Sequence, residues 1–287
     1  MRLSSTTDRL QEKFGIYKAI DILSEAGYDA IDFSQFDKEI YAADYGREYY
    51  TEIRKYAEDK GLVFNQSHAP FASSFEDKEK TAKRFDEIVL AMKRASYLGI
   101  KNIIVHPCQH LKYDVEGNPE KLFEYNMDFY GRLIPYCEEY GIRVALENMW
   151  QYTGMINHST CSRPDEFVRY LDGLNNDCFV ACLDIGHASL VREDVGDFIK
   201  KLGNKRLQCL HVHDVDGTND SHTLPFYGSV NWDKVMRALA EIDYKGDLTF
   251  EADAFMNNKP DELLPDCAIF MAKTGKYLVS QFENYKK

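Results

Sequence analysis

Short apolar segments alternate with longer amphipathic segments along the whole chain. The short segments are rich in valine, isoleucine, leucine and phenylalanine, which is typical of strands that are buried on both faces. We therefore predict eight strands, at residues 2–6, 30–34, 63–68, 102–107, 143–148, 179–184, 207–214 and 248–253.

The segments between these strands have the pattern of amphipathic helices. Several end on a glycine directly before the next strand, as in "EAGYDA" and "DKGLVF", and glycine is the usual residue at a helix C-terminus. We predict helices at residues 16–27, 45–61, 79–99, 119–141, 164–174, 194–203, 232–243 and 260–283. Repeated strand–helix units without a Pro-, Gly- or Ser-rich linker favour a single α/β domain over residues 1–287, a (β/α)8 TIM barrel rather than a doubly wound sheet.

Composition and charge narrow the class of protein. The chain has 35 Lys and Arg against 47 Asp and Glu, a formal net charge of −12, which repels nucleic-acid phosphates. The N-terminal stretch "MRLSSTTDRLQEKFG" carries charge and has no apolar core of signal-peptide length, and no run approaches the roughly 18 apolar residues of a membrane span. We expect a cytoplasmic protein with neither a membrane nor a nucleic-acid partner. The seven cysteines are scattered without a CxxC pair, so neither disulfides nor a thiolate metal site is expected.

Polar side chains stand where the predicted strands end, which is where a barrel of this type builds its active site. Four of them come from adjacent strands and are separated by 37, 27 and 40 residues, about one strand–helix unit each: Glu147, Asp184, His211 and Glu251. Any single carboxylate at a strand end is commonly an ordinary exposed group. A set of four potential ligands on adjacent strands predicts instead that their side chains converge on one site. Two glutamates, an aspartate and a histidine suit one divalent ion such as Mn²⁺, Zn²⁺, Co²⁺ or Mg²⁺.

The motifs "SHAPF", "VHP", "ALEN", "CLDIGHA", "LHVHDVDGTNDSH" and "FEAD" resemble, in order and spacing, the xylose-isomerase-like TIM-barrel superfamily over residues 28 to 255. That superfamily includes sugar-phosphate isomerases and epimerases, ketose 3-epimerases, inositol-catabolism enzymes and endonuclease IV, of AP endonuclease family 2. The resemblance places the family's single metal on Glu147, Asp184, His211 and Glu251. Its H-x-x-D pattern selects His211 over His213, and we expect only one of these two histidines to face the ligands.

The resemblance implies a metal-dependent sugar isomerase or epimerase. The ion would chelate a carbonyl and the adjacent hydroxyl of a sugar, sugar phosphate or polyol ketone, and it would stabilise the enediolate formed by proton abstraction. Glu147 and Glu251 are the expected catalytic pair, one removing the proton and the other returning it on the opposite face. The expected substrate contacts are His68, His106, Trp150, His187, Asp220 and His222. A homo-oligomer is compatible with the sequence.

Two alternatives stay open. The endonuclease IV group binds three zinc ions through nine residues, whose counterparts here are His68, His106, Glu147, Asp184, His187, His211, Asp220, His222 and Glu251. The same barrel also supports metal-dependent dehydratases and lyases. Loops such as "VREDVGD" and "HDVDGTND" are acidic and suit a DNA duplex poorly, so the sequence favours a small sugar or polyol as the substrate.

Overall fold

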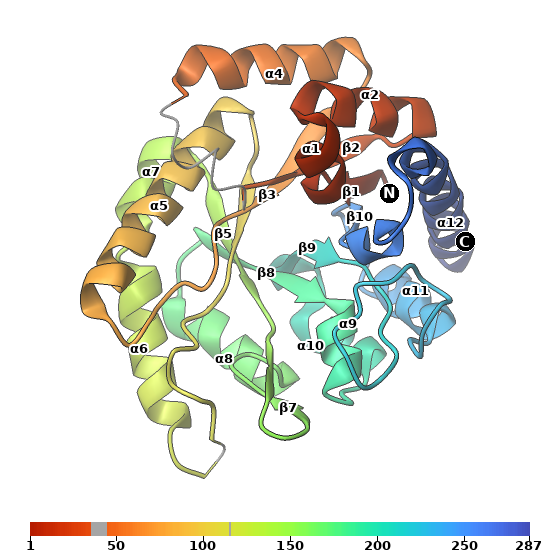
Figure 1. Ribbon diagram of the computed structural model, residues 1–287. Coiled ribbons are helices and arrows are strands. Elements are labelled where there is room, and N and C mark those ends of the chain that lie inside the picture. Colours follow the sequence, from red (N-terminus) through yellow and green to blue (C-terminus); the bar gives the residue numbers. More distant parts are fainter. Residues whose placement is uncertain (36–44, 115) are drawn as a thin grey trace.

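The computed structural model describes residues 1–35, 45–114 and 116–287, and its main sheet is a ring of parallel strands (Figure 1). The strands follow each other in the order β10-β1-β2-β3-β4-β5-β8-β9. The ring closes where Val212, just beyond β9, forms a parallel bridge to Phe250 of β10. All eight predicted strands are present: β1 (Leu3–Thr6), β2 (Ala30–Ser34), β3 (Val63–His68), β4 (Asn102–Val105), β5 (Arg143–Glu147), β8 (Phe179–Asp184), β9 (Leu207–His211) and β10 (Leu248–Phe250).

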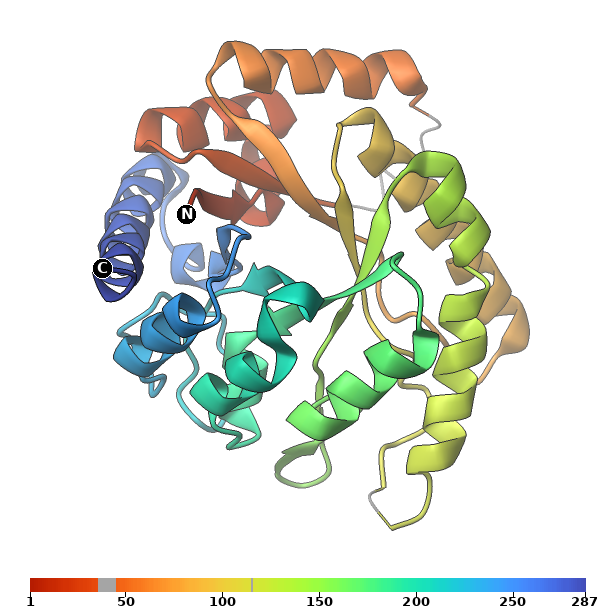
Figure 2. The same ribbon diagram turned by 180° about the vertical axis from the view of Figure 1, so that it is seen from behind.

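Helices surround the ring on its outside, as the view from behind also shows (Figure 2). Gly27 and Gly141 end two of them in the left-handed conformation, with φ of 87° and 63°. The α-helices are α1 (Asp8–Phe14), α2 (Ile16–Ala26), α4 (Arg47–Asp59), α5 (Lys78–Tyr97), α6 (Pro119–Gly131), α7 (Ile134–Tyr140), α8 (Pro164–Leu174), α9 (Ile185–Leu190), α10 (Val195–Arg206), α11 (Trp232–Glu241) and α12 (Leu264–Tyr285). Two short 3₁₀ turns, η1 (Asp253–Met256) and η2 (Asp261–Leu263), precede α12.

The helix predictions were wrong in several details. The helix predicted at 119–141 is two helices, because Pro135 has no backbone N–H and therefore favours the start of α7 over the middle of a longer helix. The short helices α1 and α9 and the hairpin of β6 (Trp150–Tyr152) with β7 (Ile156–His158) were not predicted. Each is too short to show a period in the sequence.

The interior of the ring is apolar on one side and polar on the other. Ile104, Ala145, Val180, Cys182 and Cys209 form a small apolar cluster contributed by β4, β5, β8 and β9. Polar side chains from the remaining strands make up what we call the polar half of the barrel interior, and all but the partly buried Asn65 are buried: Ser4, Asp32, Asn65, Gln66 and Thr249. Buried polar groups are tolerated where they satisfy one another, and these form a hydrogen-bonded chain.

The main hydrophobic core lies between the ring and the helices. Phe33, Phe167, Phe198 and Phe250 are among its largest fully buried side chains. Within the described ranges, none of the helices combines the length and the apolar character that a membrane crossing requires.

Candidate metal centre and its pocket

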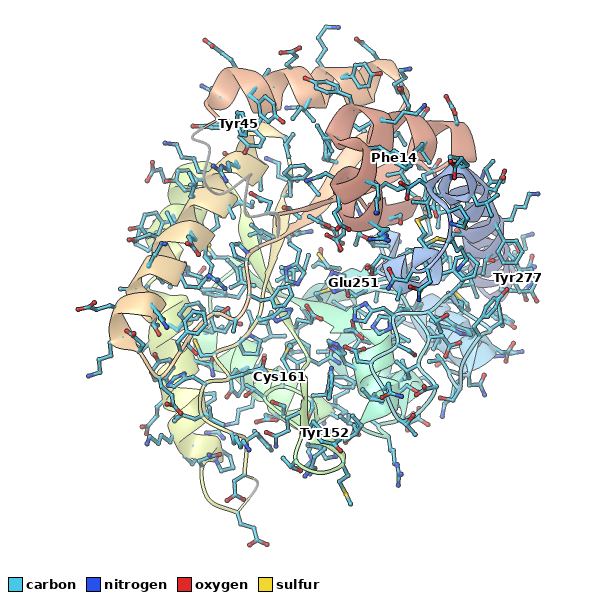
Figure 3. The ribbon with its side chains drawn as sticks, viewed as in Figure 1. Phe14, Tyr45, Tyr152, Cys161, Glu251 and Tyr277 are labelled. Atoms are coloured by element: carbon cyan, nitrogen blue, oxygen red, sulfur yellow. The ribbon has the colours of Figure 1, made fainter. Side chains whose placement is uncertain are left out.

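Four side chains meet at the carboxyl ends of β5, β8, β9 and β10. Glu147, Asp184 and His211 are the last residues of their strands, and Glu251 directly follows its strand. One ligand atom from each lies within 4.8 Å of the corresponding atoms of the other three. The Nδ1 atom of His211 lies 3.1 Å from Oε2 of Glu251 and 3.4 Å from Oε1 of Glu147. Figure 3 shows Glu251 near the middle of the barrel, whereas Tyr277 lies at its outer edge.

Hydrogen bonds from the backbone and from Asn148 fix one of these ligands, Asp184, in place. The side-chain oxygen of Asn148 accepts from the backbone N–H of Asp184 at 2.8 Å, and its amide donates to the Asp184 carbonyl at 2.9 Å, which ties the end of β5 to the end of β8. Asp184 also caps α9, because its Oδ1 accepts from the backbone N–H of His187 at 2.6 Å. The "ALEN" and "CLDIGHA" motifs are therefore hydrogen-bonded to each other at the floor of the site.

The electrostatics of this group favour a bound cation. Burial by itself raises the pKa of the Glu147 carboxyl, but His211 and His106 outweigh it and hold that pKa well below its usual range. Burial likewise opposes ionisation of Glu251, yet His211 and His222 lower the pKa of Glu251 overall. Both glutamates therefore remain ionised in a buried position, where carboxylates need an opposite charge.

Several buried atoms at the site have no hydrogen-bond partner among the described residues. They include Oε2 of Glu147, Nδ1 of His211 and Oδ1 of Asp220. An unpaired buried carboxylate oxygen is costly, and native structures rarely keep one without an ion or water. The donor set of three carboxylates and one imidazole, with unpaired atoms aimed inward, fits a divalent metal ion.

A second group of potential metal ligands lies beside the first. His187, His213, Asp220 and His222 also bring one ligand atom each to within 4.8 Å of one another. Oδ2 of Asp220 lies 3.2 Å from Nε2 of both His187 and His222, and it accepts from the indole N–H of Trp150 at 3.0 Å. Although burial lowers the pKa of His187, the charges of Asp184 and Asp220 raise it to about 10.

The expectation that only one of His211 and His213 faces the ligands was wrong. Side chains two residues apart on a strand point to the same face, and both rings are buried at the site. Nε2 of His213 lies 3.0 Å from each carboxylate oxygen of Asp184, and its ring stacks on that of His222 at 4.1 Å between centroids. His213 therefore connects the two ligand groups.

The packing of His213 explains the glycine in the "CLDIGHA" motif and yields a prediction. A Cβ atom on Gly186 would lie 2.0 Å from Cε1 of His213, whose ring is buried and cannot swing away. We expect Gly186→Ala to lower the free energy of unfolding by about 1–3 kcal/mol, the usual cost of overpacking. Urea titration measures this. Gly131→Ala is the matched control, because nothing lies within 4 Å of that Cβ position, and equal losses in both variants would contradict the packing argument.

Asp214 holds the loop that supplies Asp220 and His222. Its buried carboxylate accepts four hydrogen bonds, from the backbone N–H groups of Val215, Phe226 and Val230 and from the indole N–H of Trp232. His222 has φ of 37°, which is unusual for a residue with a side chain and is typical of functional sites. Asp214, the aspartate of the "H-x-x-D" motif, therefore holds the loop in one conformation through these four hydrogen bonds.

A pocket of about 240 Å³ opens above the ligands. His68 and His106 stand in its wall, with their Nε2 atoms 3.0 Å apart and 3.5 Å and 3.2 Å from Oε2 of Glu147. The ring of Phe71 stacks on His106 at 5.0 Å. The lining residues are His68, Phe71, His106, Gln109, Glu147, Met149, Trp150, His187, Asp220, His222 and Glu251. All six residues predicted to contact substrate thus lie in this wall, although their roles stay predictions.

Sequence reasoning missed Asn148, His213, Gln109 and Met149 at this site. The first two stand next to or near predicted ligands within "ALEN" and "LHVHD", so their position in a motif was the available signal. Gln109 and Met149 lie in loops whose path the sequence does not reveal.

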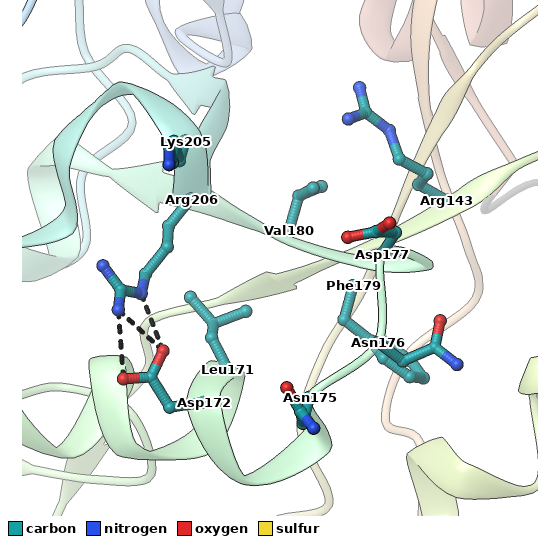
Figure 4. Close-up of a pocket in the computed structure, with 10 residues that line it drawn as sticks. All are labelled: Arg143, Leu171, Asp172, Asn175, Asn176, Asp177, Phe179, Val180, Lys205 and Arg206. Atoms are coloured by element: carbon teal, nitrogen blue, oxygen red, sulfur yellow. Dashed lines mark hydrogen bonds and ion pairs between the residues drawn. The ribbon is translucent and has the colours of Figure 1, made fainter.

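A larger hollow, of about 410 Å³, lies at the opposite end of the barrel (Figure 4). It is bordered by the first residues of β5 and β8 and by the end of α10. Two charged residues in its wall neutralise each other, because Arg206 donates hydrogen bonds to both carboxylate oxygens of Asp172. None of the predicted ligands borders it, and this end of a barrel generally serves stability rather than catalysis.

The chain is similar in sequence to several known proteins. MJ1311, an uncharacterized protein of Methanocaldococcus jannaschii, is 26% identical over 189 residues, 64% of this chain and 62% of that protein, which is less than two thirds of its length. The D-psicose 3-epimerase of Enterocloster bolteae is 24% identical over 248 residues, 84% of this chain and 78% of that enzyme. A probable endonuclease 4 of Staphylococcus aureus is 26% identical over 176 residues, 57% of this chain and 56% of that protein.

Solved structures show the same barrel. The IOLI protein, described with a bound zinc atom, superposes with a TM-score of 0.78 at 19% identity, covering 98% of this chain and 99% of that one. A D-psicose 3-epimerase in the presence of D-fructose superposes with a TM-score of 0.74 at 16% identity, over 100% and 99% of the two chains. The profile described as "Xylose isomerase-like TIM barrel" matches residues 20–270, and the chain therefore belongs to the xylose isomerase-like TIM-barrel family.

Proposed function

We propose that this protein is a metal-dependent epimerase or isomerase that acts on an unphosphorylated monosaccharide or polyol ketone. The observation that carries the proposal is the convergence of Glu147, Asp184, His211 and Glu251 within 4.8 Å at the floor of the pocket. Relatives named as sugar epimerases support the same class of reaction. One divalent ion would be held by these four side chains, and when bound it would polarise a substrate carbonyl and stabilise the negative charge left by proton removal.

The two glutamates are the acid–base pair in this proposal. Both are ionised before the reaction, since neighbouring histidines lower the pKa values of both carboxyls. They project from β5 and from the end of β10, which are separated in the ring by β8 and β9, so their carboxylates approach the pocket from different directions. As a carboxylate, Glu147 would remove the proton from the carbon next to the carbonyl and become protonated. Glu251 would take up a proton from water and deliver it to the other face of that carbon, which inverts it, and Glu147 would then lose its proton to water.

The remaining polar residues bind and orient the sugar. Both ring nitrogens of His187 have partners, because Nδ1 donates to the Asn148 carbonyl at 2.9 Å and Nε2 is hydrogen-bonded to Asp220 at 3.2 Å. His187 and Asp220 both line the pocket, so we expect them to contact the substrate as a hydrogen-bonded pair. Phe71 and Trp150 supply the apolar surface on which the C–H face of a sugar ring packs. Asp220 fixes the Trp150 ring by accepting its N–H.

The size and charge of the pocket limit the range of possible substrates. Its volume of about 240 Å³ is below the roughly 300–1,000 Å³ of pockets for drug-sized ligands, and it suits one monosaccharide. Among the described residues that line it there is neither lysine nor arginine, although phosphate recognition normally uses such a clamp. We therefore expect the substrate to be a neutral ketose rather than a sugar phosphate.

A screen of ketoses in deuterated water tests the proposal. Each candidate sugar, together with its phosphate ester, is incubated with metal-loaded protein, and the C–H signal next to the carbonyl is followed by proton NMR. We expect that signal to disappear for at least one neutral ketose and the epimeric or isomeric sugar to appear. Exchange with phosphate esters alone would overturn the substrate class, and no exchange across the ketose panel would count against the reaction.

One observation favours a second candidate function. All nine side chains that correspond to endonuclease IV ligands gather at the site, and the group of His187, His213, Asp220 and His222 could hold a further cation. A trinuclear zinc phosphodiesterase therefore remains the alternative, and counting the bound metal separates the two.

A further inference from the structure

The polar half of the barrel interior contains a buried carboxylate that the proposed chemistry leaves unused. Asp32 lies in the middle of β2 and is 0% exposed. Its Oδ2 accepts a hydrogen bond from the Gln66 amide at 2.8 Å, and Gln66 in turn accepts from Thr249 at 3.4 Å. An ionised carboxylate this deep in a protein is costly unless it faces a positive or donating partner.

The partner that faces Asp32 is His211. Oδ2 of Asp32 lies 3.6 Å from Nε2 of His211, a few tenths of an ångström beyond an ordinary hydrogen bond. The other ring nitrogen, Nδ1, points to the opposite side, toward Glu251 and Glu147. The imidazole ring therefore spans the space between the buried aspartate below and the cluster of carboxylates above.

This arrangement determines which nitrogen of His211 can bind a metal. A histidine coordinates through a nitrogen that has no proton, so Nδ1 is available only when the single proton of the neutral ring is on Nε2. A carboxylate opposite Nε2 stabilises that tautomer and limits rotation of the ring. Gln66 and the strand pairing of β2 with β3 hold this carboxylate in place.

We propose that Asp32 is a positioning residue for the metal centre, which holds His211 in the orientation and tautomer that present Nδ1 to the ion. The inference rests on the proposed metal site and adds to it a residue from a strand that contributes no ligand.

Metal affinity in the absence of substrate provides the first test. Loss of such a partner typically weakens binding about 10–100-fold. We expect the Kd for Zn²⁺ and Co²⁺, from competition with a chromophoric chelator, to rise about 10-fold in Asp32→Asn and about 100-fold in Asp32→Ala. The amide keeps an acceptor oxygen and the shape of the side chain, so Asp32→Asn remains informative if Asp32→Ala folds poorly.

Two controls separate positioning from stability and from net charge. Ser4→Ala removes a hydrogen bond to Asn65 from the same polar half of the barrel interior without touching His211. Asp253→Asn removes a negative charge near His222, 3.8 Å from its Nδ1, at the mouth of the site. We expect both variants to bind metal within about twofold of the original protein.

Long-range ¹H–¹⁵N NMR of the zinc-loaded protein gives a second readout. We expect a slowly exchanging Nε2 proton on His211, which broadens or disappears in Asp32→Ala and persists in Ser4→Ala. Unchanged affinity and an unchanged Nε2 proton in the Asp32 variants would overturn the positioning role. Failure of the original protein to bind metal would instead reject the proposed metal centre, so the two failures are distinguishable.

Discussion

Glu147→Gln is expected to leave a folded barrel that no longer exchanges the substrate proton with deuterated water. Glutamine has nearly the shape of glutamate but cannot accept the proton, and a positioned general base contributes roughly 10²–10⁴-fold to such a step. Proton NMR at saturating substrate measures the exchange rate. Normal exchange in this variant would exclude Glu147 as the base.

Two measurements make this prediction specific. Glu147 is also a proposed ligand, so the metal content of the variant is determined in the same preparation and exchange is repeated with excess metal. Glu166→Gln is the matched control, since Glu166 is a partly buried glutamate outside the pocket whose Oε2 accepts from the Tyr113 hydroxyl at 3.3 Å. We expect that control to retain full exchange.

Removal of the metal is expected to abolish exchange and to destabilise the fold. An ion that binds only the native state adds about 2.7 kcal/mol of stability at a concentration 100 times its Kd. Without it, the carboxylates of Glu147, Asp184 and Glu251 repel one another in a buried site. Dialysis against a chelator should therefore lower the melting temperature, and Mn²⁺, Co²⁺ or Zn²⁺ should restore both stability and exchange.

The number of ions bound decides between the two candidate functions. We expect about one exchangeable ion per chain by elemental analysis of the dialysed protein, as four ligands around one position imply. About three tightly bound zinc ions, together with cleavage of a duplex that contains an abasic site, would establish the phosphodiesterase instead. His222→Ala is informative here, since it removes a potential ligand that belongs to the second group and to the nine counterparts of the endonuclease IV ligands, while leaving the first group of four complete.

Much of the fold could be predicted from the order of apolar and amphipathic segments. Strands such as β5 and β8 are buried on both sides, so a continuous apolar run marks them without knowledge of their neighbours. The end of β8 at Asp184 was predicted correctly and that of β5 within one residue, whereas β4, β9 and β10 end two or three residues before their predicted ends. The division of residues 119–141 into α6 and α7 was less accessible, because an apolar pattern continues across a break caused by one proline.

The sequence by itself determined the strand–helix repeat and the polar residue types at the strand ends, because both depend on local pattern. Only the tertiary structure decided which of those side chains meet. Asp32 faces His211, and His213 reaches Asp184, through ring closure and the path of the chain beyond β9. Those distances join residues from different strands, and no local spacing encodes them. The absence of lysine and arginine from the described pocket wall, which favours a neutral sugar, is likewise a property of the folded loops.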